Sequence, residues 1–307
     1  MQIEVSIIIV NWNTKQLLLD CLSSIYGTVR NLKIEVWVVD NASTDSSVEA
    51  VRESYPQVNI LVNEQNIGFA AANNKALNKV KGAYSLLLNS DTILTDGALE
   101  KLHDFMKGMP KAGMACCQLL NSDGSKQNSI ANFPSILSLL CNESLLRFLL
   151  PGRFPSKYRD YAGPIMVDSC IGACLMVRRE AMAEVGLLDE DYFFFMEETD
   201  WAMRMRQKGW QSWLVPNAFV YHLQGQSAGD NIKARKMFYS SRDIYFRKWH
   251  SGIFLLMRGC IILRLLVNCL LNFCVVVLSA GYAKSHRKRL NTYFQLLVWY
   301  VRGCPAT

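Results

Sequence analysis

Val5-Ser6-Ile7-Ile8-Ile9-Val10-Asn11-Trp12-Asn13, near the start of the 307-residue chain, is an apolar run that turns polar at its end. The run has the length of a strand and does not alternate, which is typical of a strand buried on both faces. Similar runs follow at 34–39, 58–62 and 84–88, separated by segments of helical pattern after Thr14 (a potential N-cap), near Ser46 and over 66–80. The pattern predicts an α/β fold with a mostly parallel central sheet flanked by helices.

Polar residues follow all four predicted strands: Asn11 and Asn13, Asp40 and Asn41, Asn63 and Asn66, and Asn89 and Asp91. Asn and Asp are ordinary turn residues, so one such loop carries no information. The carboxyl ends of parallel strands meet at one edge of a sheet, and ligands bind there. Four successive polar ends therefore predict a shared binding site. Neither GxGxxG nor GxxxxGK[ST] occurs, so phosphate groups have to be met by side chains or by a metal ion.

Three carboxylates follow an aromatic run, because Glu197, Glu198 and Asp200 come directly after 192–196. At the start of a helix over 197–208, the helix dipole tolerates this negative charge. Aromatic neighbours can raise the pKa of a carboxyl group toward the range of a general base. The alternative is a charged first turn in which Asp200 pairs with Arg204. His222 ends the second of two strand-like segments, 210–215 and 216–222. Whether it has a structural or a functional role depends on the residues that lie opposite it.

The segment 135–150 is apolar on several faces and is followed by the helix breakers Pro151, Gly152 and Pro155. It predicts either a helical flap over a site or a helix that completes the core. Further on, 174–177 has the pattern of a strand and 179–185 that of a helix, with Gly186 as its C-cap.

The C-terminal part of the chain is basic and apolar. Residues 241–307 carry a net charge of +9, so the first 240 residues carry −2 of the total of +7. The 19 residues 265–283 contain no charge, slightly fewer than the ~20 that span a bilayer. Asn268 and Asn272 within this run would be unfavourable in contact with lipid. Basic residues on both flanks give no orientation by the positive-inside rule.

We expect a helix or hairpin on the cytosolic membrane surface here, with a dimer interface or a membrane span as alternatives. The basic residues interleave with aliphatic ones, which disfavours nucleic-acid binding. The ten cysteines form no CxxC pair or zinc pattern and are expected to be reduced thiols. Met1 leads directly into the first strand without a basic segment, so no secretory signal peptide is predicted.

Six stretches together resemble the family 2 glycosyltransferases, and within them the rhamnosyltransferase-like branch that decorates bacterial surface polysaccharides. They appear in family order at 5–13, 38–45, 66–74, 88–91, 172–179 and 197–200. The resemblance implies a GT-A fold with a nucleotide-sugar half over 1–120 and an acceptor half over 121–245. A basic, apolar helical tail, either membrane-associating or dimerising, then occupies 246–307.

The same resemblance implies roles for individual residues. Asp40 matches the acid that holds the nucleoside, and Asp91 matches the last acid of the metal-binding DxD motif. His222 can complete the metal site, and Glu198 matches the general base. The remaining expected substrate-binding residues lie in or beside the matching stretches: Asn11, Asn13, Asn41, Asn66, Gly68, Asn89 and Trp201.

Two positions depart from the family pattern. Asn89 stands where the strict motif has Asp, so the metal site has one carboxylate fewer. Glu198 stands where the family often has Asp, so Glu197 and Asp200 stay open as alternatives for the base. Mg²⁺ or Mn²⁺ is the expected cofactor, because these ions prefer oxygen ligands and often bind through one or two carboxylates and substrate phosphates.

The predicted function is inverting transfer of a sugar, rhamnose being the expected one, from a nucleotide-diphosphate donor. The acceptor is a polysaccharide or polyprenyl-linked glycan at the inner face of the cell membrane. A sugar nucleotidyltransferase is one alternative, but residues 10–14 lack the Gly-rich basic loop that a triphosphate requires. A non-catalytic sugar-nucleotide-binding partner in an assembly complex is the other.

Overall fold

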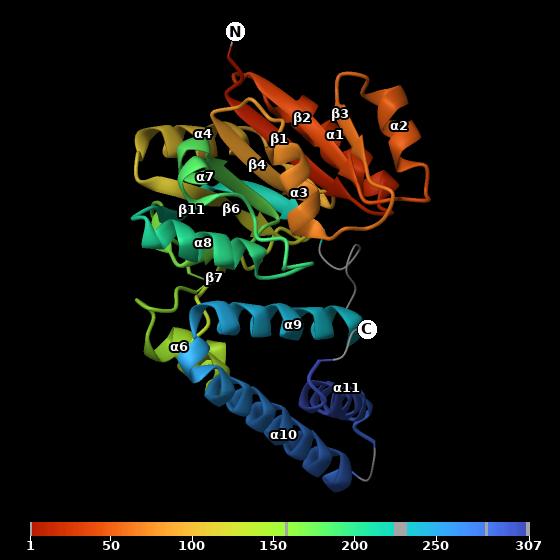
Figure 1. Ribbon diagram of the computed structural model, residues 1–307, viewed down its shortest axis with the longest axis vertical. Coiled ribbons are helices and arrows are strands. Elements are labelled where there is room, and N and C mark those ends of the chain that lie inside the picture. Colours follow the sequence, from red (N-terminus) through yellow and green to blue (C-terminus); the bar gives the residue numbers. More distant parts are fainter. Residues whose placement is uncertain (1, 157–158, 224–231, 280–281, 305–307) are drawn as a thin grey trace. The chain divides into compact units, whose positions relative to one another are not determined.

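A computed structural model describes residues 2–156, 159–223, 232–279 and 282–304. The chain divides into two compact units (Figure 1). The sheet unit comprises Met1–Phe133 and Pro155–Ser227, and the helical unit comprises Pro134–Phe154 and Ala228–Thr307. The division falls before the expected boundary at residue 245, and the helical unit takes a segment from the middle of the sequence as well.

The described part of the sheet unit is built on a nine-stranded sheet with the order β3-β2-β1-β4-β10-β6-β11-β5, in which β8 also pairs with β11. The strands are β1 (Val5–Asn11), β2 (Ile34–Asp40), β3 (Asn59–Val62), β4 (Tyr84–Asn89), β5 (Thr92–Leu94), β6 (Ala112–Leu120), β8 (Ile165–Val167), β10 (Cys174–Arg178) and β11 (Gln211–His222). A second, two-stranded sheet joins β7 (Ile130–Ala131) to β9 (Ser169–Cys170).

Helices cover both faces of this sheet, as the burial of β1 shows. The helices of the sheet unit are α1 (Lys15–Thr28), α2 (Ser47–Ser54), α3 (Phe69–Leu77), α4 (Ala98–Gly108), α7 (Arg179–Val185) and α8 (Glu197–Gln207). Helix α3 packs against β1 and β2, while α4 packs against β6 and β11. Six of the seven β1 residues are buried, and since successive side chains point to opposite faces, both faces of the strand are covered. The predicted α/β fold is confirmed.

The four predicted strands are present and run parallel as β3, β2, β1 and β4. Beyond β4 the sheet is mixed, because β10 is antiparallel to both β4 and β6. Thr14 does not cap α1 with its side chain; its hydroxyl donates to Asn11 Oδ1 at 2.7 Å instead. Gly186 ends α7 with a φ of 80°, as predicted for a C-cap.

The helical unit contains the apolar tail. Its helices are α5 (Ile136–Leu140), α6 (Glu143–Leu149), α9 (Ile232–Trp249), the 3₁₀ turn η1 (Ser251–Ile253), α10 (Phe254–Leu278) and α11 (Lys284–Val301). Helix α10 packs against α11, α9 and α5, so the segment 135–150 covers part of the tail and is not a helix of the sheet unit's core. Its apolar residues therefore serve the packing of the helical unit.

Helices α10 and α11 form an antiparallel hairpin. Arg258, near the start of α10, donates to the carbonyl of Tyr300, near the end of α11, at 2.9 Å. At the other end His286 Nδ1 lies 2.9 Å from Asn272 Oδ1. A buried carboxylate joins α9 to this pair, since Asp243 accepts a hydrogen bond from the Tyr300 hydroxyl and pairs with Arg258 at 3.6 Å. These polar contacts fix how the three helices align.

The outer face of α10 is apolar. Its buried side chains follow helical spacing at Met257, Cys260, Ile261, Leu265 and Asn272, and they mark the packed face. The exposed large side chains are all hydrophobic: Leu255, Leu256, Leu263, Leu266, Val267, Leu270, Leu271, Phe273, Val275, Val277 and Leu278. Within the described residues, Ser251–Leu278 is the one helical stretch long and apolar enough to cross a membrane by length and composition.

Candidate functional site

The parallel register brings the predicted polar strand ends together. Asn11 lies opposite Asp40 across β1 and β2, and Val10 lies opposite Asn89 across β1 and β4. Asp40 accepts a hydrogen bond from Asn11 Nδ2 at 2.8 Å and another from the backbone N–H of Ser43 at 2.8 Å. Both Asn11 and Asp40 are buried, so this carboxylate is fixed in orientation at the edge of the sheet.

Asn41 holds the next two loops. Its side chain donates to the Gly68 carbonyl at 3.2 Å and accepts from Asn63 Nδ2 at 2.8 Å. Asn63 in turn accepts from Lys75 Nζ at 2.6 Å. Asn41 and Asn63 are thus buried supports of the edge, and Lys75 brings a positive charge to them.

Two further predicted residues shape loops with their side chains. Asn13 adopts a left-handed conformation with a φ of 54°, and its Oδ1 accepts from the backbone N–H of Thr44 at 2.7 Å. Its own N–H donates to Ser43 Oγ at 2.9 Å, so it joins the loops after β1 and β2 while staying exposed. Asn66 Oδ1 accepts from the Gly68 N–H at 3.0 Å.

Asp91 and His222 face each other at the end of β4. His222 Nε2 lies 3.3 Å from Asp91 Oδ1 and 3.4 Å from Asn89 Nδ2. Its other nitrogen, Nδ1, lies 2.6 Å from Gln127 Oε1. The Gln127 amide donates its own N–H groups to Asn121 and to the His222 carbonyl, so its oxygen is the acceptor and His222 Nδ1 is the donor.

This arrangement suits a divalent cation on a phosphate group. His222 Nε2 and the Asp91 carboxylate lie side by side in a buried space, and imidazole nitrogens and carboxylate oxygens are both ligands of divalent cations. The hydrogen bond from the outer nitrogen to Gln127 would orient such a ligand. Within the described residues no group of three or more His, Cys, Asp or Glu side chains could hold a metal ion, so a bound ion would take further ligands from the substrate.

The three carboxylates of α8 have different surroundings. Glu197 is buried, and among the described residues its Oε2 has no hydrogen-bond partner. Burial, and to a smaller extent the nearby Glu198, raises its pKa well above the usual value. Glu198 is partly exposed, and burial of its carboxyl group raises its pKa to about 7, against the effect of bonds from its own N–H and Thr199. Burial thus raises the pKa of both carboxyl groups, and of these two residues only Glu198 is partly exposed.

Asp200 serves the packing of α8. Its side chain is fully buried, and Oδ2 pairs with Arg204 Nε at 2.9 Å, the contact one turn apart expected from the sequence. Arg204 also donates to the carbonyls of Val185 and Leu187, both at 2.7 Å. A carboxylate enclosed in this way has no access to a substrate hydroxyl.

The structure corrects the prediction that Trp201 binds substrate. Its side chain is 0% exposed, and Nε1 donates to the Gly186 carbonyl at 2.8 Å. Trp201 lies on the face of α8 that is turned into the core, so it anchors the helix.

Gly68 is explained by a close backbone approach. A Cβ atom at this position would lie 2.5 Å from the Phe193 carbonyl oxygen, and the φ of Gly68 is 85°. The same carbonyl accepts from the Phe69 N–H at 2.8 Å. The aromatic run before α8 is thereby attached to the start of α3, which places the carboxylate pair beside the loop that follows β3.

The connection into α8 is strained. Phe195 and Met196 both have positive φ values, 73° and 72°, although neither is glycine. Each left-handed residue costs about 1–2 kcal/mol, and two in succession require support from their surroundings. Phe194 provides such support through an edge contact with Phe69 and a tilted contact with Phe195, at ring-centroid distances of 6.2 and 4.3 Å.

Several supporting residues were not found from the sequence. Gln127, Ser43 and Phe193 act through contacts with residues distant in the chain. Gln127 belongs to no recognised motif, whereas Ser43 and Phe193 lie in stretches that the sequence singled out, but neither was assigned a role. Ser90 was part of a quoted motif but had no assigned role; its hydroxyl lies 2.9 Å from that of Thr14 and connects the loop before Asp91 to β1.

Comparisons with known proteins agree with this geometry. The sequence model of Glycosyl transferase family 2 matches residues 6–186. N-acetylglucosaminyl-diphospho-decaprenol L-rhamnosyltransferase of Mycobacterium tuberculosis is 30% identical over 234 residues, covering 71% of this chain and 76% of that protein. An N-acetylglucosaminyltransferase of Bradyrhizobium diazoefficiens is 30% identical over 219 residues, 66% of this chain and 41% of that protein. The chain belongs to glycosyl transferase family 2.

Solved structures show the fold. A mannosyltransferase of Pyrobaculum calidifontis, in complex with GDP-Man and Mn²⁺, superposes with a TM-score of 0.59 at 16% identity over 98% of this chain and 87% of that chain. GalNAc-T7, with UDP, GalNAc and Mn²⁺, superposes with a TM-score of 0.57 at 16% identity, over 80% of this chain and 50% of that chain. The predicted family and GT-A fold are confirmed, the protein is a glycosyltransferase, and no comparison favours the nucleotidyltransferase or the non-catalytic partner.

Proposed function

We propose that this enzyme transfers a sugar with inversion and that Glu198 is its general base. The observation that carries the proposal is Glu198, a partly exposed residue whose carboxyl group has its pKa raised to about 7 by burial. The acceptor hydroxyl oxygen forms a bond to the anomeric carbon while the bond from that carbon to the diphosphate oxygen breaks. The hydroxyl proton passes to Glu198. One displacement inverts the carbon, so a single base is sufficient.

The donor diphosphate is assigned to the edge that carries Asp91, His222 and Asn89, with the nucleoside near Asp40. Asp91 and His222 would hold a Mg²⁺ or Mn²⁺ ion there, since their facing acceptors suit a cation. When bound, such an ion neutralises the charge that develops on the leaving diphosphate. Gln127 keeps the His222 ring in the tautomer that turns Nε2 toward Asp91.

The donor and acceptor are proposed from similarity. The Mycobacterium tuberculosis relative is named for rhamnosyl transfer to N-acetylglucosaminyl-diphospho-decaprenol, and it matches most of this chain. We take rhamnose, carried by a thymidine-diphosphate donor, as the sugar and a polyprenyl-linked glycan as the acceptor. Such an acceptor is embedded in a membrane, which agrees with the apolar outer face of α10.

The helical unit is proposed to lie in the plane of the cytosolic membrane surface. The turn between α10 and α11 is followed at once by Lys284, Arg287, Lys288 and Arg289. An upright hairpin would have to carry these four cations through the hydrocarbon, where a charged residue at the centre costs about 2.5–3.5 kcal/mol on the insertion scale. Asn272 is buried and turned toward α11, so the objection that the sequence raised for this residue does not apply.

A donor panel tests the proposed reaction. The full chain is incubated with Mn²⁺, an N-acetylglucosaminyl-diphosphate lipid and each of several nucleotide-diphosphate sugars, and both nucleotide release and glycolipid mass are measured. We expect transfer from the thymidine-diphosphate rhamnose donor and from no other at a comparable rate. Transfer of another sugar would overturn the choice of rhamnose. Absence of transfer from every donor, in a protein that binds them, would favour the non-catalytic alternative.

A further inference from the structure

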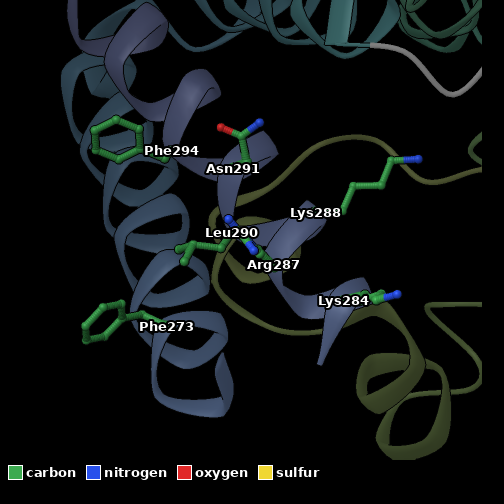
Figure 2. A pocket seen from close by; sticks show the side chains of 7 residues that line it. All are labelled: Phe273, Lys284, Arg287, Lys288, Leu290, Asn291 and Phe294. Atoms are coloured by element: carbon green, nitrogen blue, oxygen red, sulfur yellow. The ribbon is translucent and has the colours of Figure 1, made fainter. Parts of the chain in front are cut away.

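Helices α10 and α11 border a surface cavity of about 790 Å³, which is open to solvent and which the proposed reaction does not use. Figure 2 shows the side chains that line it. Three are cationic and come from the first two turns of α11: Lys284, Arg287 and Lys288. Phe273 of α10 and Phe294 of α11 contribute aromatic rings. The cavity therefore combines a positive wall with an apolar one.

The positive wall has no internal counter-charge. The spacing of Lys284, Arg287 and Lys288 places them on one face of the helix. The sequence from 251 to 307 contains no Asp or Glu, and in the described part of the chain none of the three cations forms an ion pair. Lys284 and Lys288 repel each other, and cations in the first turn oppose the helix dipole. An anion in the cavity would offset both costs.

The apolar wall continues onto the outer face of α10. Phe273 and Phe294 are each more than half exposed, at 54% and 58%. The neighbouring Leu270 and Leu271 are exposed to a similar extent, at 61% and 59%. A ligand that fits both walls has a compact anionic group attached to long apolar chains.

We propose that this cavity binds the phosphate group of an anionic phospholipid, whose acyl chains lie along the exposed face of α10. The inference rests on the proposed membrane association and gives it a specific lipid contact. Lys284, Arg287 and Lys288 surround the phosphate, and Asn291, one turn beyond Arg287, adds an amide donor. The phosphate then marks the depth at which the helical unit lies in the membrane surface.

Other occupants fit less well. A free phosphate would leave the aromatic rings and the α10 face exposed to water. A second copy of the helical unit would bring the same positive wall, and it has no acid from 251 onward with which to pair. A phospholipid satisfies the charge and the apolar area at the same time.

Vesicle binding tests the proposal with two variants that remove equal charge. Arg287→Gln/Lys288→Gln changes the cavity, whereas Arg289→Gln/Arg302→Gln changes exposed positions of α11 and its end that do not line it. The full chain is sedimented with phosphatidylcholine vesicles, with and without phosphatidylglycerol. General surface attraction predicts the same loss for both variants, about fivefold per basic residue. The proposed site predicts that the cavity variant loses at least about tenfold more binding to phosphatidylglycerol vesicles than its control.

A second pair of variants adds charge without changing size. Asn291→Asp places an anion in the cavity, and Gln295→Glu places one on an exposed position of the same helix. We expect the first to lose phosphatidylglycerol binding and the second to keep most of it. Binding of either variant to pure phosphatidylcholine should equal that of the unmodified chain, because the α10 face is intact.

Three results would overturn the assignment. Equal losses of binding in the matched variants would show that the cavity residues act only through general surface charge. The proposed membrane association would then remain, without a specific lipid site. If the chain prefers vesicles that contain a polyprenyl phosphate to phosphatidylglycerol vesicles of equal charge, the ligand of the cavity is the polyprenyl phosphate. A lipid-free dimer that Leu270→Ser/Leu271→Ser dissociates would assign the α10 face to a second copy. If the unmodified chain binds neither vesicle, the proposed membrane association is itself wrong.

Discussion

Replacement of Glu198 by Gln is expected to abolish transfer and, at alkaline pH, to stabilise the fold. The folded chain holds the Glu198 carboxyl group with its pKa raised to about 7, whereas the ordinary value is 4.5. Between these two pH values the unfolded chain ionises Glu198 and the folded chain does not. The free energy of unfolding therefore falls as the pH rises through this range and stays lower above it.

The size of the effect follows from the shift. Each pKa unit corresponds to about 1.4 kcal/mol, so ionised Glu198 costs the folded state at most about 3.5 kcal/mol at pH 8. Gln has nearly the same shape and cannot ionise, so Glu198→Gln should recover most of this at pH 8 and almost none at pH 4.5. Loss of a general base lowers turnover by about 10²–10⁴-fold.

Two measurements on two variants make the test. Urea unfolding at pH 4.5 and pH 8 gives the stability, and nucleotide release with acceptor gives the activity. Glu197→Gln is the matched control, because it removes the neighbouring buried carboxyl group and leaves Glu198 in place, and it should keep activity within about tenfold. The unmodified enzyme should lose about tenfold in kcat/KM between pH 8 and pH 6, as Glu198 takes up a proton.

The reasoning is refuted by either of two outcomes. If Glu198→Gln transfers at a normal rate and Glu197→Gln does not, the base is Glu197. If Glu198→Gln is less stable at both pH values by a similar amount, the carboxylate makes stabilising contacts that its surroundings do not indicate.

Three further variants test the supporting structure. Gln127→Leu removes the acceptor of His222 Nδ1 and should weaken Mn²⁺ binding about 10–100-fold by calorimetry, whereas Gln127→Glu should keep it; equal affinity in the Leu variant would contradict the tautomer assignment. Gly68→Ala should destabilise the fold by at least about 2 kcal/mol in urea, because its Cβ meets the Phe193 carbonyl and its φ of 85° disfavours a side chain. Asp200→Asn leaves a buried cation unpaired and should cost about 3 kcal/mol. Its turnover per folded molecule should nevertheless stay near normal, and a loss comparable to that of Glu198→Gln would return Asp200 to the candidates for the base.

The sheet edge could be predicted because its signal is local. An unalternating run such as 5–10 identifies a doubly buried strand, and the residue at which the run turns polar marks its carboxyl end. The register then makes Asn11 and Asp40 neighbours without further information. The direction of β10 could not be predicted in this way. Its residues are buried like those of a parallel strand, and only its pairing with β4 and β6 reveals the reversal.

The roles of single residues were less accessible. Trp201 lies beside a family motif and was expected to bind substrate, but its side chain fills the core. Gly68 lies in a motif with the same expected role, and the structure shows in addition that it allows a close backbone approach. A motif records that a residue type is required and does not record why. The three acids of α8 show the same limit, since their spacing reveals a pair with Arg204 but not which carboxylate stays partly exposed.

Unfavourable features concentrate at the start of α8, and this supports the site independently of any family resemblance. Two non-glycine residues with positive φ precede the helix, and two carboxyl groups with raised pKa begin it. Each feature destabilises the fold, and the contacts of Phe193 and Phe194 hold them in place. A chain with no use for Glu198 would gain stability from a neutral side chain there. The strain and the raised pKa therefore support the proposal that Glu198 accepts a proton at this turn. In the same proposal the cation site at the end of the parallel strands has the complementary role of balancing the charge of the leaving diphosphate.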